Sequence, residues 1–444
     1  MDIPDEVRPK HVYIPGKTQY GKSNLLLWMF IQDVVQGHGV CLMDGKGDLA
    51  PEALNFIPKR RIEDTVYLDT NTPVPLDFMD YKNNDEKEAI IGELKYVLTR
   101  TVETQHIPII GANITDILYT LFNYNENPKT PDECRATFLD IYYFLEDEKR
   151  RTQILDLVTD QDLQRRWKDK FPNPTDRSRI TTRMTPFVRS ETLKKIFGAK
   201  KPKLNVAQFM EEEKVLVVNL GPMTDIRRIY GTLLLSKIRQ TADRRASIPK
   251  SQRKRFYLYC DEFQEFQTSD FDTMLSRAGG LGLCLTLAHQ FLAQLEPRIL
   301  HSIKGNVSTY ILFRLGDDAA SFRSEIPPLA TKPVWRRSPE SGLMGWTYEP
   351  VPFDTSLLTK LSVGEALYRA ADGSASLIHT PPPPTREGAS SAGTIRRRTL
   401  EKYSCDIPQV CSTGEDGNRT PRPEGIAPGG AANVPSHGGK KKNA

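Results

Sequence analysis

The 444-residue chain lacks any apolar run that approaches the roughly 18 residues a membrane-spanning helix requires. Its opening stretch, MDIPDEVRPK, has no apolar core of the kind that a secretory signal peptide needs. The six cysteines are scattered without C-x-x-C spacing, which argues against a zinc site and against a disulfide framework. These absences favour a reducing compartment. We expect a cytoplasmic protein with no transmembrane segment of its own.

Net charge is also nearly absent over most of the chain. The formal charge is +5, but residues 381–444 contain ten Lys or Arg and six Asp or Glu. The other residues therefore contain 51 basic and 50 acidic side chains. Any contact with nucleic acid must come from a local patch, because the folded part is not a basic domain as a whole.

Strand and helix patterns alternate in two separate parts of the chain. The first part has β patterns in HVYIP, GVCLMD and DTVYLD, with a helical pattern over 22–36. From 84 to 203 only helical spacing is found. From 204 onward strands return in KVLVVNLG, RFYLYCDEF, GLCLTLAHQ and VSTYILFRLG. We expect one α/β domain with a parallel sheet, formed by 10–83 and 204–380, which an all-helical insertion over 84–203 interrupts.

The last third of the chain contains three segments of different character. Residues 333–350 are expected to form an irregular excursion, and a closing hairpin is expected to turn at Asp372-Gly373. After four prolines at 381–384, the composition is Pro, Gly, Ser and charged residues with few large apolar side chains. We therefore predict a disordered Pro/Gly/basic tail over 381–444.

The stretch GKTQYGKS at 16–23 matches the Walker A pattern in full. Its glycines let backbone N–H groups point at phosphate oxygens, and the following helix adds the positive end of its dipole. Lys22 would reach the β- and γ-phosphates, and the Ser23 hydroxyl would ligate Mg²⁺. The alternative is a chance Gly-rich loop, but a strand precedes the motif and a helix follows it. ATP and Mg²⁺ are thus the predicted cofactors, and the predicted nucleotide-binding residues are Gly16, Lys17, Thr18, Gln19, Tyr20, Gly21, Lys22, Ser23 and Asn24.

The apolar strand in RFYLYCDEF ends on two acids, Asp261 and Glu262. Beside a phosphate-binding loop, Asp261 would hold Mg²⁺ and Glu262 would polarise the attacking water. The alternative is a pair of acids that cap a strand at a turn. Gln290 ends the next apolar strand, either as a sensor of the γ-phosphate or as an ordinary strand-end amide. For His289 beside it the alternatives are a ligand and, more typically, a packed or hydrogen-bonded residue. The predicted catalytic residues are Lys22, Glu262 and Gln290.

Five motifs together resemble the FtsK/HerA superfamily of ATPases: GKTQYGKSNLL, CLMDGKGDL, YLYCDEFQEF, LCLTLAHQFLAQL and STYILFRLG. Within it they are most similar to the TraD/TraG-type coupling proteins of conjugation and type IV secretion. The resemblance covers most of 10–380, strongly at the motifs and loosely between them. It implies a RecA-like P-loop NTPase domain that self-associates into a ring, a hexamer in this group, and moves DNA through its centre. The matched motifs carry Lys22, Ser23, Asp261, Glu262 and Gln290.

The sequence departs from the family pattern in features that concern anchoring and assembly. Membrane-bound coupling proteins begin with transmembrane helices and an N-terminal assembly domain, and neither precedes the first strand here. A membrane or relaxosome partner protein would then bring the chain to the bacterial inner membrane. The family often has an arginine eleven residues before the glutamine, and that position is Gly279. Arg277 is the nearest candidate arginine finger; the others are Arg227, Arg228 and Arg314.

Basic residues are concentrated over 177–203, which contains nine Lys or Arg and a single acid. Such a density can neutralise DNA phosphates through backbone contacts. The alternative is a solvated charged face. The predicted DNA contacts in this segment are Arg179, Arg183, Lys194 and Lys195. Two further clusters, 396–398 and 440–442, are expected to be flexible.

The combined pattern predicts an ATP-hydrolysing DNA translocase in which Glu262 activates the attacking water. One alternative is an ATPase that energises secretion of protein or pilus subunits without gripping DNA, because the charge outside the tail is nearly balanced. Another is a nucleotide-dependent adaptor with little turnover. The unassigned arginine finger favours the adaptor, and the intact pair of acids disfavours it.

Overall fold

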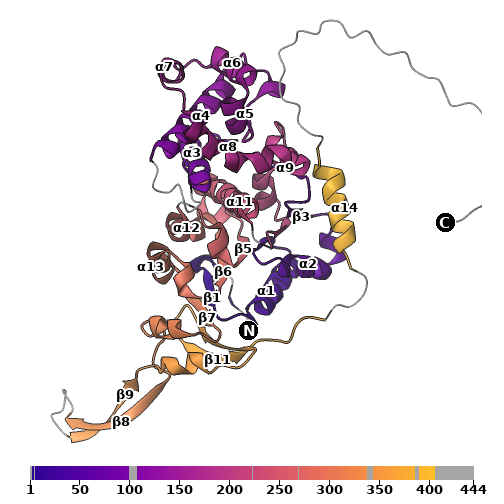
Figure 1. Ribbon diagram of the computed structural model, residues 1–444. Helices are drawn as coiled ribbons and strands as arrows, with labels where there is room; N and C mark the ends of the chain where they lie inside the picture. Colours follow the sequence, from indigo (N-terminus) through magenta and orange to yellow (C-terminus); the bar gives the residue numbers. More distant parts are fainter. Residues whose placement is uncertain are drawn as a thin grey trace, which may run out of the picture. The chain divides into compact units, whose positions relative to one another are not determined.

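A nine-stranded sheet forms the centre of the fold in the computed structural model, which describes residues 3–4, 6–99, 108–222, 224–268, 270–337, 344–385 and 390–405 (Figure 1). The strand order is β11-β10-β7-β1-β6-β5-β2-β4-β3. The strands have these bounds: β1 Val12–Pro15, β2 Gly39–Asp44, β3 Thr65–Asp69, β4 Val215–Asn219, β5 Phe256–Asp261, β6 Leu283–His289, β7 Thr309–Leu312, β10 Glu365–Arg369 and β11 Ala375–His379.

The strands from β7 to β3 in this order are parallel, whereas β10 and β11 add an antiparallel hairpin at one edge. Gly373, with a φ of 88°, lies in the turn of this hairpin, where a hairpin is predicted. Strands β1, β2, β5 and β6 are buried at every position, which explains their continuous apolar sequences. The predicted α/β fold with a parallel sheet is confirmed.

Helices cover both faces of the sheet, as parallel pairing requires (Figure 1). Side chains of α1 (Lys22–Gln36) and α2 (Leu49–Ala53) share one apolar layer with the sheet. Those of α11 (Asp225–Arg244), α12 (Phe271–Arg277) and α13 (Pro297–Asn306) share the other. None of the helices in the described ranges combines the length and apolarity needed to cross a bilayer.

Every described element between β3 and β4 is helical. Phe197 of this region packs edge-on against Tyr230 of α11, so the helices and the sheet share one apolar layer. A buried ion pair between Arg150 and Asp140, with 2.7 Å between Nε and Oδ1, joins two neighbouring helices. The helices are α3 Asn84–Thr99, α4 Pro108–Glu126, α5 Asp140–Glu146, α6 Glu148–Leu157, α7 Gln161–Asp169, α8 Pro174–Arg189, α9 Glu191–Gly198 and α10 Val206–Glu211, with a 3₁₀ turn at Asp132–Cys134.

Three cysteines of the sheet, Cys41, Cys260 and Cys284, are buried and are not disulfide-bonded. Burial raises the pKa of the Cys41 thiol well above its usual range. Cys134, in contrast, is disulfide-bonded. The cysteine spacing argued against disulfides, and at Cys134 that prediction is wrong.

The segment expected to be an irregular excursion at 333–350 is instead a two-stranded antiparallel ribbon. Strand β8 (Ala330–Arg337) pairs with β9 (Met344–Val351), with Ala330 opposite Val351. Pro333 and Pro350 made this segment unlike a strand in the sequence. A two-stranded ribbon consists of two edge strands, and proline is tolerated at edges because its missing N–H is not needed there.

Helix α14 (Ala392–Tyr403) lies within the predicted disordered tail and packs against β3 at the sheet edge (Figure 1). Ile395 is fully buried in the layer that contains α1. The Thr399 Oγ1 accepts a hydrogen bond from the backbone N–H of Tyr67 at 3.2 Å. Composition predicted disorder because only three buried side chains, spaced four residues apart, hold the helix: Ile395, Thr399 and Tyr403. The prediction for 406–444 lies outside the described residues.

The basic cluster at 396–398 is accordingly part of a packed helix rather than of a flexible segment. The Arg396 guanidinium lies 4.5 Å from the centre of the Tyr67 ring, and Arg398 forms an ion pair with Glu63. Arg397 lies 3.7 Å from Glu401, so all three arginines of this cluster have partners within the chain, which reduces their availability to DNA.

Truncation of Ile395 to alanine tests whether α14 is packed. Loss of a fully buried isoleucine side chain should lower the free energy of unfolding by about 2–4 kcal/mol. The matched control is Arg397→Ala on the same helix, whose side chain is 70% exposed and should change stability by less than about 0.5 kcal/mol. Denaturant unfolding of both variants measures the difference. Equal midpoints for the two variants would mean that the tail is not packed.

His11 is a buried neutral imidazole at the start of β1. Its Nδ1 accepts from the backbone N–H of Leu285 at 3.2 Å, so Nε2 carries the proton and donates to the Leu275 carbonyl at 3.0 Å. Burial lowers the pKa of His11 to about 4. A proton on Nδ1 would face an N–H donor, so the site stays neutral over the physiological range.

Because the unfolded chain binds a proton at His11 near pH 6.5 and the folded chain only near pH 4, stability should fall as pH falls through this window. The contribution of this residue is about 2 kcal/mol between pH 7 and pH 5. His11→Asn keeps an acceptor for Leu285 and removes the titration. Urea unfolding at both pH values should give a smaller pH dependence for the variant, and an unchanged dependence would contradict the assignment.

Candidate nucleotide-binding site

Residues 16–21 form the loop between β1 and α1, and Lys22 and Ser23 begin α1, at the carboxyl end of the parallel strands. A Cβ added at Gly16 would come within 2.5 Å of the Phe313 Cβ, so a side chain there would displace the loop. Gly21 caps α1 with a φ of 112°, a left-handed conformation that favours glycine. Residues Gly16 to Ser23 therefore form a close-packed turn at a helix N-terminus, which is the backbone arrangement that binds anions.

Lys22 is buried inside this turn. Its Nζ donates to the Gly16 carbonyl at 2.5 Å and to the Lys17 carbonyl at 3.1 Å. Burial lowers the pKa of Lys22, and the acids Glu262 and Asp261 oppose that shift. The ammonium group is thus curled back against its own loop and faces the carboxylates across the site.

Two carboxylates end adjacent strands of the sheet. Asp44 of β2 is paired in register with Asp261 of β5, and the Ser23 hydroxyl donates to the Asp261 Oδ2 at 3.2 Å. Burial raises the pKa of Asp261 to about 7, with further contributions from Glu262 and Asp44. The other oxygen of Asp261 is buried and has no partner among the described residues. A hydroxyl beside a carboxylate with a free oxygen is a donor set that fits Mg²⁺.

Glu262 directly follows β5 in the left-handed conformation, with a φ of 53°. Its carboxylate is buried and accepts two amide hydrogen bonds, one from Gln290 at 2.7 Å and one from Gln264 at 2.8 Å. The structure therefore brings Lys22, Ser23, Asp261, Glu262 and Gln290 together at one edge of the sheet. Sequence analysis did not single out Gln264, although it lies two residues after Glu262.

His289 is a packed residue, as its position suggested. It hydrogen-bonds the Tyr13 hydroxyl through Nε2, and burial lowers its pKa to about 3. Its ring also stacks on that of Tyr13, with 5.3 Å between centroids. A neutral, enclosed imidazole of this kind supports the sheet next to Gln290.

Asp44 shapes the turn after β2, a role that sequence analysis did not assign. Its carboxylate accepts from the backbone N–H groups of Lys46, Gly47 and Ala50 at 2.8–2.9 Å. A Cβ at Gly221 would come within 1.9 Å of the Lys46 carbonyl oxygen. The signal was present, since the segment DGKGDL was recognised as a motif without a function.

The proline segment that follows β11 contacts helix α1. The Asn24 side chain donates to the Pro381 carbonyl at 2.6 Å, and the Trp28 indole donates to the Pro382 carbonyl at 2.8 Å. Tyr20 accepts a hydrogen bond on its hydroxyl from Arg314 at 2.9 Å. The proline run at 381–384, expected to begin the disordered tail, is thus bound along α1 in its described part.

The position where the family often has an arginine finger cannot hold a side chain. A Cβ at Gly279 would come within 1.9 Å of the Pro9 carbonyl oxygen. Arg277 is 56% exposed and lies 3.7 Å from Asp243. Of the other candidates, Arg228 pairs with Glu265 at 2.8 Å, whereas Arg314 lies on the nucleotide loop of its own chain. Arg277 is thus largely exposed, and its role as arginine finger stays a prediction.

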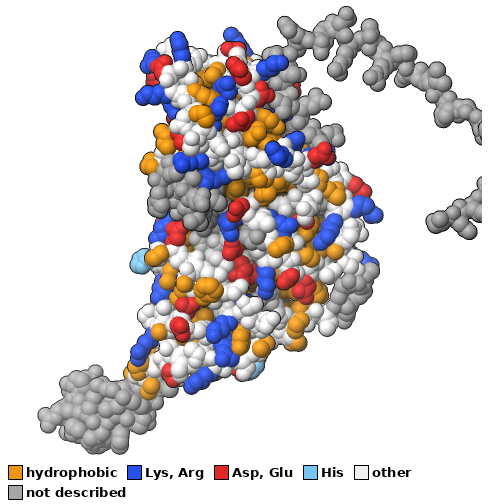
Figure 2. All heavy atoms as spheres, viewed as in Figure 1, with side chains coloured by type: hydrophobic (Ala, Val, Ile, Leu, Met, Phe, Trp, Pro, Cys, Tyr) orange, Lys and Arg blue, Asp and Glu red, His pale blue; other side chains and the backbone are white. Residues whose placement is uncertain are grey.

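The predicted DNA contacts lie on two helices of the insertion, away from the nucleotide loop. Arg179 and Arg183 belong to α8, and Lys194 and Lys195 belong to α9. Arg179 lies 3.8 Å from Asp176, one turn earlier. Over the face drawn in Figure 2, acidic and basic side chains are interspersed, in keeping with the balanced charge of the folded part.

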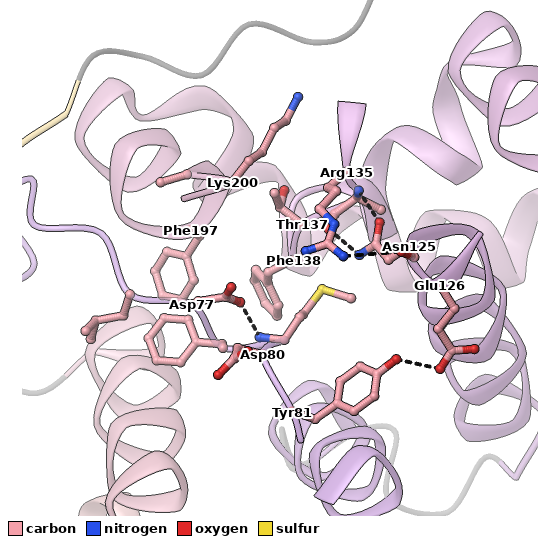
Figure 3. A pocket seen from close by; sticks show the side chains of 15 residues that line it. Asp77, Asp80, Tyr81, Asn125, Glu126, Arg135, Thr137, Phe138, Phe197 and Lys200 are labelled. Atoms are coloured by element: carbon pink, nitrogen blue, oxygen red, sulfur yellow. Dashed lines mark hydrogen bonds between the residues drawn. The ribbon is translucent and has the colours of Figure 1, made fainter. Parts of the chain in front are cut away.

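A separate cavity of about 280 Å³ opens where the insertion meets the sheet domain (Figure 3). Asp77 and Asp80 line it from the segment after β3, and Arg135 and Lys200 line it from the insertion. Tyr81 donates to Glu126 at 2.5 Å across its rim. None of the nucleotide-loop residues reaches this cavity, so it is not part of the site described above.

Comparison with known proteins identifies relatives in fold. Residues 255–326 match the family described as the TraM recognition site of TraD and TraG. The plasmid coupling protein TrwB in complex with ADP and Mg²⁺ is 14% identical, with a TM-score of 0.59 over 88% of this chain and 89% of that chain. TrwB with the ATP analogue ADPNP has 13% identity and a TM-score of 0.57 over 85% of this chain and 87% of that one.

VirB4 of Thermoanaerobacter pseudethanolicus is also similar, with 13% identity and a TM-score of 0.52 over 85% of this chain and 89% of that chain. No curated protein matches the sequence. The fold and the matched segment confirm the resemblance that the motifs predicted, and the chain is similar in architecture to the TraD/TraG-type conjugative coupling proteins.

Proposed function

We propose that the protein is an ATP-hydrolysing DNA translocase of the coupling-protein type. The observation that supports this most directly is the convergence of the Walker A loop with Asp261 and Glu262 at one edge of the sheet. Each of these groups has a chemical role in phosphoryl transfer to water. The similar TrwB structures contain ADP with Mg²⁺ or an ATP analogue, which supports the same ligands here.

In this proposal, each residue of the site has a separate role in ATP binding or hydrolysis. Loop N–H groups and Lys22 bind the phosphates, and Ser23 and Asp261 would hold Mg²⁺. When bound, Mg²⁺ supplies charge neutralisation on the phosphate oxygens. Glu262, held at the site by two amides, orients the attacking water and accepts its proton. Gln290 links Glu262 to the end of β6, where it can report the state of the γ-phosphate.

Assembly and partners follow from the same proposal. The copies form a ring, a hexamer by analogy with the family, in which Arg277 of one copy acts on the nucleotide of the next. DNA passes through the centre and is held by backbone contacts from the insertion. The match at 255–326 points to a relaxosome-type protein as partner, and such a partner would recruit the chain to its place of action at the bacterial inner membrane.

Two other functions remain as alternatives with observations in their favour. The balanced charge outside the tail favours an ATPase that energises protein or pilus secretion without gripping DNA. The backbone of Pro9 leaves no room for an arginine side chain at Gly279, where the family often has its arginine finger. This favours an adaptor with little turnover. The convergence of the acids with Lys22 weighs against the adaptor, because such an arrangement is needed for hydrolysis rather than for binding alone.

The first test is the rate of ATP hydrolysis by the full chain with and without single- and double-stranded DNA. Glu262→Gln should lower kcat by about 10²–10⁴-fold and leave ATP binding intact, because only the proton acceptor is lost. Strong stimulation by DNA in the wild type supports a DNA motor. Turnover that is indifferent to DNA supports the secretion ATPase, and tight ATP binding without turnover supports the adaptor.

Replacement of the four basic residues on α8 and α9 by alanine tests the DNA contacts. The variant should lose stimulation by DNA, and its DNA affinity should depend less steeply on salt, because fewer counterions are released on binding. The matched control removes four exposed basic residues elsewhere: Lys59, Arg60, Lys250 and Lys360. Equal loss in both variants would show that α8 and α9 are not the DNA contact surface.

A further inference from the structure

Gln264 lies in the 3₁₀ turn Phe263–Phe266 that follows Glu262, and its side chain returns to the site. The residue is 7% exposed, and its Nε2 donates to the Glu262 Oε2 at 2.8 Å. The other oxygen of the same carboxylate accepts from Gln290. A carboxylate only accepts hydrogen bonds, so each glutamine must direct its amide nitrogen, and not its amide oxygen, at Glu262. The Glu262 carboxylate is thus clamped in one plane from two sides.

The two amides that clamp Glu262 differ in origin. Gln264 belongs to the same turn as Glu262 and is separated from it by a single residue, so the two move together. Gln290 follows β6 and approaches from the neighbouring strand. If Gln290 turns toward the γ-phosphate, Glu262 keeps its orientation only through Gln264. Gln264 would therefore hold the Glu262 carboxylate throughout, whereas Gln290 would exchange this hydrogen bond for one to the phosphate.

The environment of Gln264 is not what stability alone would select. Its Oε1 is buried and has no hydrogen-bond partner within the described part of the chain. A buried acceptor without a donor lowers the free energy of unfolding, a cost that an apolar side chain of similar size would avoid. Gln240 on α11 shares this unpartnered oxygen, so the feature that distinguishes Gln264 is its hydrogen bond to the Glu262 carboxylate.

We propose that Gln264 is a positioning residue for ATP hydrolysis, acting through Glu262. This inference rests on the proposed function, since it requires Glu262 to be the group that activates water. It goes beyond it by assigning a role to a residue outside the Walker motifs. The role is to hold the carboxylate plane so that one oxygen is directed at the attacking water when Gln290 is engaged elsewhere.

The test compares two substitutions of a buried glutamine by leucine, one inside the site and one outside it. Gln264→Leu should lower kcat by about 10–100-fold, with KM for ATP and the unfolding midpoint nearly unchanged. The control is Gln240→Leu on α11. Gln240 is 4% exposed, donates one amide hydrogen bond to Ser236, and likewise has an unpartnered buried Oε1, but it lies outside the site. Its kcat should equal that of the wild type.

A double-mutant cycle separates positioning from a general structural effect. In the Glu262→Gln background, Gln264→Leu should cause no further loss of kcat, because the group it supports is already inactive. Turnover by the wild type together with full kcat in Gln264→Leu would overturn this inference alone. A loss of unfolding midpoint in proportion to kcat, or independent losses in the double mutant, would also overturn it. A wild type without turnover, with or without DNA, would overturn the proposed function and this inference with it.

Discussion

The parallel register of four strands is the constraint on which the site depends. Pro15 of β1 lies opposite His289 of β6, Ala288 of β6 lies opposite Asp261 of β5, and Asp261 lies opposite Asp44 of β2. Parallel strands end at the same edge of the sheet. Ser23 can therefore donate a hydrogen bond to Asp261, although the two residues are more than 200 positions apart in the chain. A shift of one residue in any of these pairings would turn the corresponding side chain to the opposite face of the sheet.

This arrangement buries one ammonium group and three carboxyl groups, and each is held by the protein itself. Lys22 is bonded to loop carbonyls, Asp261 to the Ser23 hydroxyl and Asp44 to backbone N–H groups. Glu262 is bonded to two amides. Under the proposed function, nucleotide binding would exchange these partners, and Mg²⁺ would meet the one oxygen of Asp261 that has no partner among the described residues. The raised pKa of Asp261 and the lowered pKa of Lys22 both reflect this desolvation.

Much of the fold and the main motifs could be predicted from the sequence, because buried parallel strands are continuous apolar runs and the loop has a fixed spacing. The elements that were missed depend on contacts between distant segments. Helix α14 is specified by three side chains that match the surface of β3, and no local pattern distinguishes it from a polar tail. A side chain at position 279 is excluded by the backbone of Pro9, which is about 270 residues away in the sequence. Gln264 acquires its role only because its turn folds back onto Glu262.

The hydrogen bond from the Tyr67 N–H to Thr399 has a consequence for how copies of this chain can meet. A strand at the edge of a sheet normally presents its N–H and C=O groups to any other strand, and one sheet can then continue into the next molecule. With α14 seated against β3, that edge already has an occupant from its own chain. In the proposed ring, contact between copies on this side would therefore involve side-chain surfaces, because backbone pairing with β3 would require displacement of the helix.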